Sequence, residues 1–147
     1  MTTKKLIVYP TDFSECSLVA LHWVRTLAQS LDADVSCLYV VEEPHIYSTL
    51  DVGPVAIPSL TELVRSAETR LDGFIKSNLK NFGKAPKAVV LVGRAADEIV
   101  AHARENAAEL IVMATHGYSG VRHLLLGSTT ESVLRHAICP VLSIRSV

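Results

Sequence analysis

Residues that could bind a phosphorylated ligand gather between positions 114 and 131, a stretch that reads ATHGYSGVRHLLLGSTTE. Gly127, Ser128 and Thr129 stand directly before a helical pattern in this stretch. The backbone N–H groups and the dipole at the start of a helix attract anions. Glycine lets a phosphate approach the backbone, and the hydroxyl groups add hydrogen-bond donors. We therefore predict a phosphate-binding loop here.

The same stretch admits an interpretation that needs no ligand. Ser128 and Glu131 have the spacing of a capping box, in which the two side chains satisfy the first backbone groups of a helix. Gly117 and Gly120 are less easily explained in this way, because two positions that permit positive φ indicate a looping backbone. A cap and a phosphate site are compatible, so both interpretations stay open at this point.

A second group of polar residues follows the first apolar run, in the segment YPTDFSE at 9–15. The carboxylate of Asp12 could accept hydrogen bonds from two hydroxyl groups, such as those of a ribose. Asp12 could instead serve as a turn or cap residue for a helix that begins near Ser14.

Motifs of catalysis and metal binding are missing from the sequence. It contains no GxxxxGK[ST], no GxGxxG after the first apolar run and no GxSxG. His116 and His123 lack an obvious third ligand, and no nucleophile and base can be paired. We predict no metal site and no catalytic residues.

Five short runs rich in Val, Ile and Leu lie at 5–9, 35–41, 88–92, 110–114 and 140–144. They show little polar alternation, which is typical of strands that are covered on both faces. Helical patterns separate the runs, and the longest follows Pro58 with a capping box at Ser59 and Glu62. This order predicts a single doubly wound α/β domain over 1–147, with a parallel sheet and helices on both faces.

Ligands of such sheets bind beyond the carboxyl ends of the strands, where the strand order reverses. If the first and fourth strands are neighbours, Thr11 and Asp12 face the glycine-containing loop. The longer connection at 42–58 contains three prolines, and its role stays open.

The bulk properties argue against several classes of partner. The 147 residues carry a net charge of −1, which gives no electrostatic case for nucleic acid or for an anionic membrane. We expect neither a signal peptide nor a membrane helix, because the apolar run at the start is too short for the first and no run is long enough for the second. Cys16, Cys37 and Cys139 are odd in number and include no CxxC, which favours reduced thiols and a cytoplasmic location.

Three segments resemble the universal stress protein family: VYPTDFSE at 8–15, YVVE at 39–42, and VMATHGYSGVRHLLLGSTTESVLRHAICPVLSIR at 112–145. The order of the elements agrees over essentially the whole chain. In this family the five-stranded parallel sheet has the order 3-2-1-4-5, and many members bind ATP. The family signature is Gly, two residues, Gly, nine residues, then Gly followed by Ser or Thr. Gly117, Gly127 and Ser128 match this signature, whereas Ala114 replaces the first glycine.

The resemblance implies a nucleotide-binding stress-response module that binds ATP. We expect little or no hydrolysis, because no P-loop lysine and no base are evident, and we expect a divalent cation such as Mg²⁺ to help by offsetting the charge of the triphosphate. The resemblance also implies a homodimer through the C-terminal strand. The alternative is a dimeric interaction protein or small-ligand-binding protein with the same fold and no nucleotide. The implied site residues are Pro10, Thr11, Asp12, Val40, Met113, Ala114, Gly117, Gly127, Ser128 and Thr129.

Overall fold

The computed structural model describes residues 3–43, 58–116 and 126–145. Gly117, Gly120, His123 and most of the 42–58 connection therefore lie outside the described residues. The elements are β1 (Leu6–Pro10), α1 (Glu15–Leu18), α2 (Leu21–Leu31), β2 (Asp34–Val41), α3 (Leu60–Asn78), β3 (Lys87–Val92), α4 (Ala95–Glu105), β4 (Leu110–Ala114), α5 (Ser128–His136) and β5 (Val141–Ile144).

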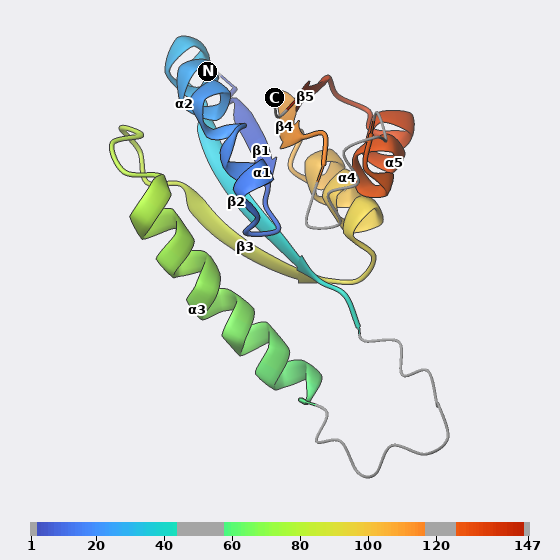
Figure 1. Ribbon diagram of the computed structural model, residues 1–147. Coiled ribbons are helices and arrows are strands. Elements are labelled where there is room, and N and C mark those ends of the chain that lie inside the picture. Colours follow the sequence, from blue (N-terminus) through green and yellow to red (C-terminus); the bar gives the residue numbers. More distant parts are fainter. Residues whose placement is uncertain (1–2, 44–57, 117–125, 146–147) are drawn as a thin grey trace.

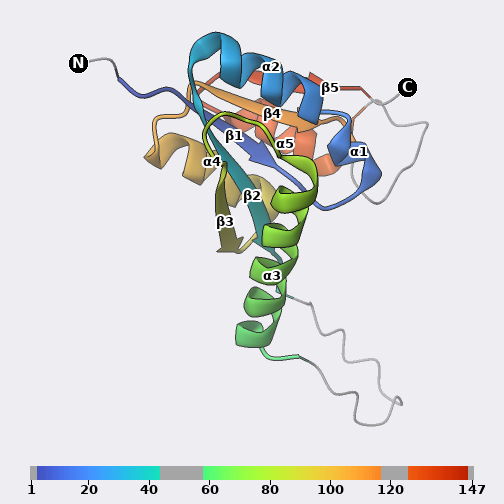
Figure 2. The ribbon, with the colours of Figure 1, turned by 90° about the vertical axis from the view of Figure 1, so that its left-hand side faces the viewer.

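The five strands form one parallel sheet in the order β3-β2-β1-β4-β5. This confirms the predicted doubly wound fold and its strand order. Helices α2 and α3 cover one face of the sheet, and α4 and α5 cover the other (Figure 1). Figure 2 looks onto the face that α2 and α3 cover. The strand order reverses at β1, which has β2 on one side and β4 on the other.

Each face of the sheet has its own apolar core, which explains why the strands read as continuous apolar runs. Side chains alternate between the two faces along a strand. Ile7 and Tyr9 accordingly pack with residues of α2 and α3, whereas Val8 packs with residues of α4 and α5. All three side chains are fully buried.

One helix start follows the predicted cap, and another is capped by a neighbour of the residue that was considered for it. Ser59 and Glu62 form the predicted capping box of α3. Ser14 caps α1, and its side chain accepts a hydrogen bond from the backbone N–H of Ser17. A second helix, α2, begins at Leu21, because the backbone of α1 ends at Leu18.

The turn from β3 to α4 depends on Gly93. Its φ is +151°, and a Cβ atom at this position would lie 2.7 Å from Oε1 of Glu98. Only a glycine fits this close turn without strain. The turn places the first residues of α4 at the carboxyl edge of the sheet, beside the end of β2.

The three cysteines are free thiols with different surroundings. Cys37 lies in the core, where burial raises the pKa of its thiol to about 12. Cys16 and Cys139 are partly exposed. In the described parts of the chain, none of the helices is both long and apolar enough to cross a membrane.

Candidate functional site

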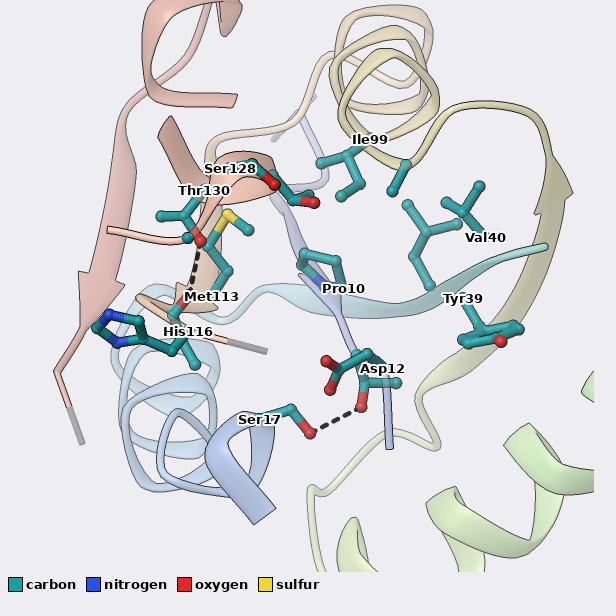
Figure 3. Close-up of a pocket in the computed structure, with 16 residues that line it drawn as sticks. Pro10, Asp12, Ser17, Tyr39, Val40, Ile99, Met113, His116, Ser128 and Thr130 are labelled. Atoms are coloured by element: carbon teal, nitrogen blue, oxygen red, sulfur yellow. Dashed lines mark hydrogen bonds between the residues drawn. The ribbon is translucent and has the colours of Figure 1, made fainter. Parts of the chain in front are cut away.

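A pocket of about 340 Å³ lies at the carboxyl edge of the sheet, where β1 and β4 lead into their helices (Figure 3). This is the reversal point of the strand order, where open α/β sheets bind ligands. Nine of the ten residues predicted for the site line this pocket, and the tenth, Gly117, lies outside the described residues. The nine are Pro10, Thr11, Asp12, Val40, Met113, Ala114, Gly127, Ser128 and Thr129.

The Thr11 hydroxyl is committed to holding the turn that follows β1. Its Oγ1 accepts a hydrogen bond from the backbone N–H of Phe13 at 3.0 Å and lies 2.9 Å from Oγ of Ser17. The Thr11 N–H donates to the carbonyl of Leu38 at 2.9 Å. Behind this turn, the hydroxyl of the buried Tyr9 donates to the carbonyl of Ser17 at 2.7 Å. Thr11 therefore shapes the pocket wall mainly through its backbone.

Asp12 combines the two roles that its position in the sequence left open. Its Oδ1 accepts a hydrogen bond from the Ser14 N–H at 2.9 Å and another from the Ser14 hydroxyl. Asp12 also lines the pocket, across from Ser128 and Thr130 in Figure 3. A carboxylate offers about four lone-pair directions, so the turn does not exhaust its capacity to accept hydrogen bonds.

The backbone of Val40 faces the pocket because β1 ends before β2 does. Pro10 is the last residue of β1 and pairs with Leu38, while β2 continues beside β3 to Val41. In a parallel sheet, alternate residues direct both backbone groups to the same neighbouring strand. The Leu38 carbonyl accepts from the β1 side, so the N–H and C=O of Val40 point to that side too. There they meet the space that β1 has left.

The first turn of α5 forms the opposite wall, and its cap differs from the predicted one. Gly127, not Ser128, is the N-cap, and it makes no side-chain cap. The expected capping box is therefore wrong: the Glu131 carboxylate pairs with Arg135 at 2.8 Å. The Thr130 hydroxyl donates to the Ala114 carbonyl at 2.9 Å and ties α5 to β4. As a result, no side chain of the described residues caps the start of α5.

Gly127 and Ala114 lie close together at the exit of β4. The Gly127 N–H donates to the Thr115 carbonyl at 2.7 Å, and a Cβ atom at Gly127 would approach the same carbonyl to 3.1 Å. Ala114, which replaces the first signature glycine, is the last residue of β4 and pairs with Ile144. The extended backbone of a strand suits alanine, so its φ does not require glycine here.

The start of α4 also reaches the pocket, but a carboxylate already accepts a hydrogen bond from its backbone N–H. Ala95 lines the pocket, and its N–H donates to Oε1 of Glu42 at 2.8 Å. Two helix N-termini thus meet the pocket with different electrostatics. The α4 terminus is neutralised by the negative charge of Glu42, whereas Gly127 brings no side chain to the α5 terminus.

Several pocket residues were not found from the sequence. Ala95 and Ile99 come from α4, whereas the expected strand order placed the site only at the ends of the first and fourth strands. His116 was assigned no role, and its Nδ1 lies 3.0 Å from the Thr115 hydroxyl. The residues missed are Ser17, Leu38, Tyr39, Ala95, Ile99, His116 and Thr130. Within the described ranges, no three His, Cys, Asp or Glu side chains gather as they would around a metal ion.

Comparison with known proteins gives one consistent family. The universal stress protein family matches residues 4–145. Universal stress protein MJ0531 of Methanocaldococcus jannaschii is 35% identical over 148 residues, which cover 96% of this chain and 82% of that protein. Universal stress protein MJ0577 of the same organism is 30% identical, over 96% of this chain and 94% of that protein.

Solved structures agree with this result. The structure of MJ0577 superimposes with a TM-score of 0.78 at 30% identity, over 97% of this chain and 96% of that chain. A universal stress protein in complex with cAMP has the same fold, with a TM-score of 0.63, 24% identity and coverage of 97% and 98%. The universal stress protein from Archaeoglobus fulgidus in complex with dAMP superimposes with a TM-score of 0.65 at 23% identity, over 98% of this chain and 99% of that chain.

Proposed function

The chain belongs to the universal stress protein family, and from this premise we propose that its strand-end pocket binds an adenine nucleotide, with ATP as the main ligand. The observation that carries the proposal is that the two helix N-termini at the pocket differ in whether a carboxylate binds their backbone N–H groups. Gly127 leaves the α5 terminus without a capping side chain, whereas Glu42 covers the α4 terminus. The α5 terminus can attract phosphates, whereas at the α4 terminus the carboxylate already offsets this attraction.

This difference orients the nucleotide. The phosphates lie at Gly127, Ser128 and Thr129, where backbone N–H groups and two hydroxyl groups can donate to them. The ribose lies beside Asp12, whose carboxylate accepts from its hydroxyl groups. The adenine edge meets the backbone N–H and C=O of Val40. The cAMP and dAMP complexes of two proteins with this fold support an adenine nucleotide as the ligand.

The proposal includes a divalent cation bound together with the nucleotide. Mg²⁺ usually keeps several waters and is held by phosphate oxygens with one or two carboxylates, and a dedicated protein cage is not needed. It would offset the charge of the triphosphate at the start of α5. Hydrolysis is slow or absent, because the described residues of the pocket offer no pair of a nucleophile and a general base. The proposal also includes a homodimer through β5.

Two measurements test whether the pocket binds ATP. Mass spectrometry of the supernatant from freshly purified, denatured protein should detect an adenine nucleotide. Titration calorimetry of nucleotide-free protein should show that ATP binds more tightly than GTP and that EDTA weakens the binding. If ATP gives no heat with or without Mg²⁺ and no adenine nucleotide is released, the non-nucleotide alternative is the better description.

Asp12→Asn tests the ribose contact, because the amide keeps an oxygen that can accept from Ser14 but loses the charge. We expect the affinity for ATP to fall by roughly ten- to a hundredfold, which corresponds to about 1.5–3 kcal/mol for a hydrogen bond to a charged group. Asp72→Asn is the matched control, because Asp72 is exposed on α3. Equal ATP affinities of the two variants would remove Asp12 from the site.

A further inference from the structure

Phe13 has an unusual backbone conformation directly beside the pocket. Its φ is 65°, in the left-handed region, and it stands between Asp12 and the helix cap Ser14. A bulky residue rarely adopts this conformation. Such conformations persist only where the surrounding structure holds them, and they cluster at functional sites.

Three side chains hold the ring of Phe13. Tyr39 of β2 stacks on it, with the ring centroids 4.6 Å apart and the planes inclined by 28°. Phe74 of α3 contacts it edge-on at 5.6 Å. The guanidinium of Arg70, also on α3, lies 4.5 Å from the ring centroid. Aromatic and cation–π contacts of this kind are attractive, so they offset the cost of the backbone conformation.

The backbone of Phe13 connects this ring cluster to the pocket. Thr11 and Asp12 precede the N–Cα bond of Phe13, whereas Ser14 and α1 follow it. Several hydrogen bonds cross this bond. They include Ser14 N–H to Asp12 Oδ1 at 2.9 Å, Thr11 Oγ1 to Ser17 Oγ at 2.9 Å, and the Tyr9 hydroxyl to the Ser17 carbonyl at 2.7 Å. Rotation about the bond toward an ordinary negative φ would move the two sides relative to one another and disrupt these interactions.

We propose that Phe13 is a positioning residue, which fixes the orientation of Asp12 and Thr11 toward the ribose end of the pocket. The contacts of its ring with Tyr39, Phe74 and Arg70 keep the left-handed backbone in place. As far as it concerns ligand binding, this inference rests on the proposed nucleotide function. The positioning itself is a property of the ligand-free protein and can be measured without a nucleotide.

Phe13→Leu and Phe13→Gly test the proposal in complementary ways. Leucine keeps an apolar side chain without an aromatic face, whereas glycine accepts the positive φ without strain but offers no ring. Phe13→Tyr keeps the ring and should restore the wild-type behaviour. Phe82→Leu is the matched control: Phe82 belongs to the same core and lies 5.0 Å below the Arg25 guanidinium, but it is not part of the turn that carries Thr11 and Asp12.

The first measurement is amide hydrogen exchange at Ser14 in the nucleotide-free protein. The second is the ratio of the affinities for ATP and 2′-deoxyATP, which reports whether Asp12 still recognises the ribose hydroxyl. In both Phe13→Leu and Phe13→Gly, we expect Ser14 exchange to rise by about tenfold or more and the affinity ratio to fall toward one. Phe13→Tyr and Phe82→Leu should keep both values close to wild type.

If Phe13→Gly folds and keeps wild-type exchange at Ser14, the ring does not position the turn and the proposal is wrong. The same conclusion follows if Phe82→Leu changes Ser14 exchange as much as the Phe13 variants do. A wild-type protein that binds no ATP would refute the nucleotide function, while the exchange measurement would still decide the role of Phe13.

Discussion

Gly127 stands at the closest approach between the exit of β4 and the start of α5. Its N–H is bonded to the Thr115 carbonyl, and a Cβ atom would lie 3.1 Å from that oxygen and 3.7 Å from Cα of His116. Its φ of −68° is open to any residue. The space around it, and not its backbone conformation, is therefore what makes glycine suitable at this position.

Gly127→Val should weaken ATP binding, because a branched side chain crowds the place where the phosphates meet the backbone. Loss of one phosphate contact corresponds to about 1.5–3 kcal/mol, or roughly ten- to a hundredfold in affinity. Titration calorimetry measures the loss, and circular dichroism checks that the fold is kept. Normal ATP binding by this variant would contradict the assignment of the phosphate site.

Gly73→Ala provides the control for a glycine replacement without crowding. Gly73 lies within α3, and nothing approaches a Cβ atom there within 4 Å. Alanine is favoured over glycine inside a helix by about 0.5–1 kcal/mol. We expect Gly73→Ala to raise the melting temperature slightly and to leave ATP binding unchanged.

The residues of the pocket were largely predictable from the sequence, but their hydrogen bonds were not. Ser128 and Glu131 have the correct spacing for a capping box, yet the helix begins one residue earlier because Gly127 is bonded to Thr115. That shift brings the Thr130 hydroxyl to the Ala114 carbonyl. The spacing of residues along the chain does not show which of two adjacent positions is the N-cap when a tertiary hydrogen bond fixes the helix start.

At the scale of elements, the five strands were predictable because each is covered on both faces and reads as an apolar run. The break between α1 and α2 was not, because an apolar pattern shows which face is buried but does not show where the backbone is interrupted. The contribution of Ala95 and Ile99 to the pocket was not predictable either. The path of α4 across the sheet depends on the close turn at Gly93 and on packing of distant residues.

His102 links α4 to β2, and this contact should make the stability depend on pH. Its Nε2 lies 3.0 Å from the Ser36 hydroxyl, and Asn106 approaches its Nδ1 at 3.4 Å. Burial lowers the pKa of His102 and the positive charge of Lys87 lowers it further, while Glu105 acts in the opposite direction. The folded protein therefore binds a proton at His102 less readily than the unfolded chain does.

The sign of the effect follows from this difference. As the pH falls below about 6.5, the ordinary pKa of histidine, the unfolded chain takes up the proton first and stability is lost until the lowered pKa is passed. His102→Gln should remove this part of the pH dependence, as measured by urea unfolding between about pH 7.5 and 5. His136→Gln, at the exposed end of α5, is the control. Parallel pH profiles for wild type and His102→Gln would contradict the expectation.

At the scale of the whole molecule, β5 is an edge of the sheet. Ile111 donates to the Pro140 carbonyl and Thr115 to the Ile144 carbonyl, so by alternation Leu142 and Ile144 direct their backbone groups to β4. Val141 and Ser143 direct theirs outward. An edge of this kind is available for pairing with a second copy of the chain.

Ser143→Pro tests the proposed homodimer, because proline removes an outward N–H and is tolerated on an edge strand. We expect wild-type protein to sediment near twice 16.0 kDa and the variant to shift toward one chain. Ser143→Ala, which keeps the N–H, should remain dimeric. Leu142→Pro is less suitable, since it would remove a hydrogen bond within the sheet. A monomeric wild-type protein at micromolar concentration would refute the dimer.

The direction of the strands has a consequence for how such a pair would respond to its ligand. A two-fold axis that pairs β5 with its copy joins the sheets antiparallel into one of ten strands. The carboxyl edges of the two halves then point in opposite directions, so the two pockets open at opposite rims of the joined sheet. The residues described as lining each pocket would all come from one chain. Saturation of the pair would therefore follow a simple hyperbola, with a Hill coefficient of about one.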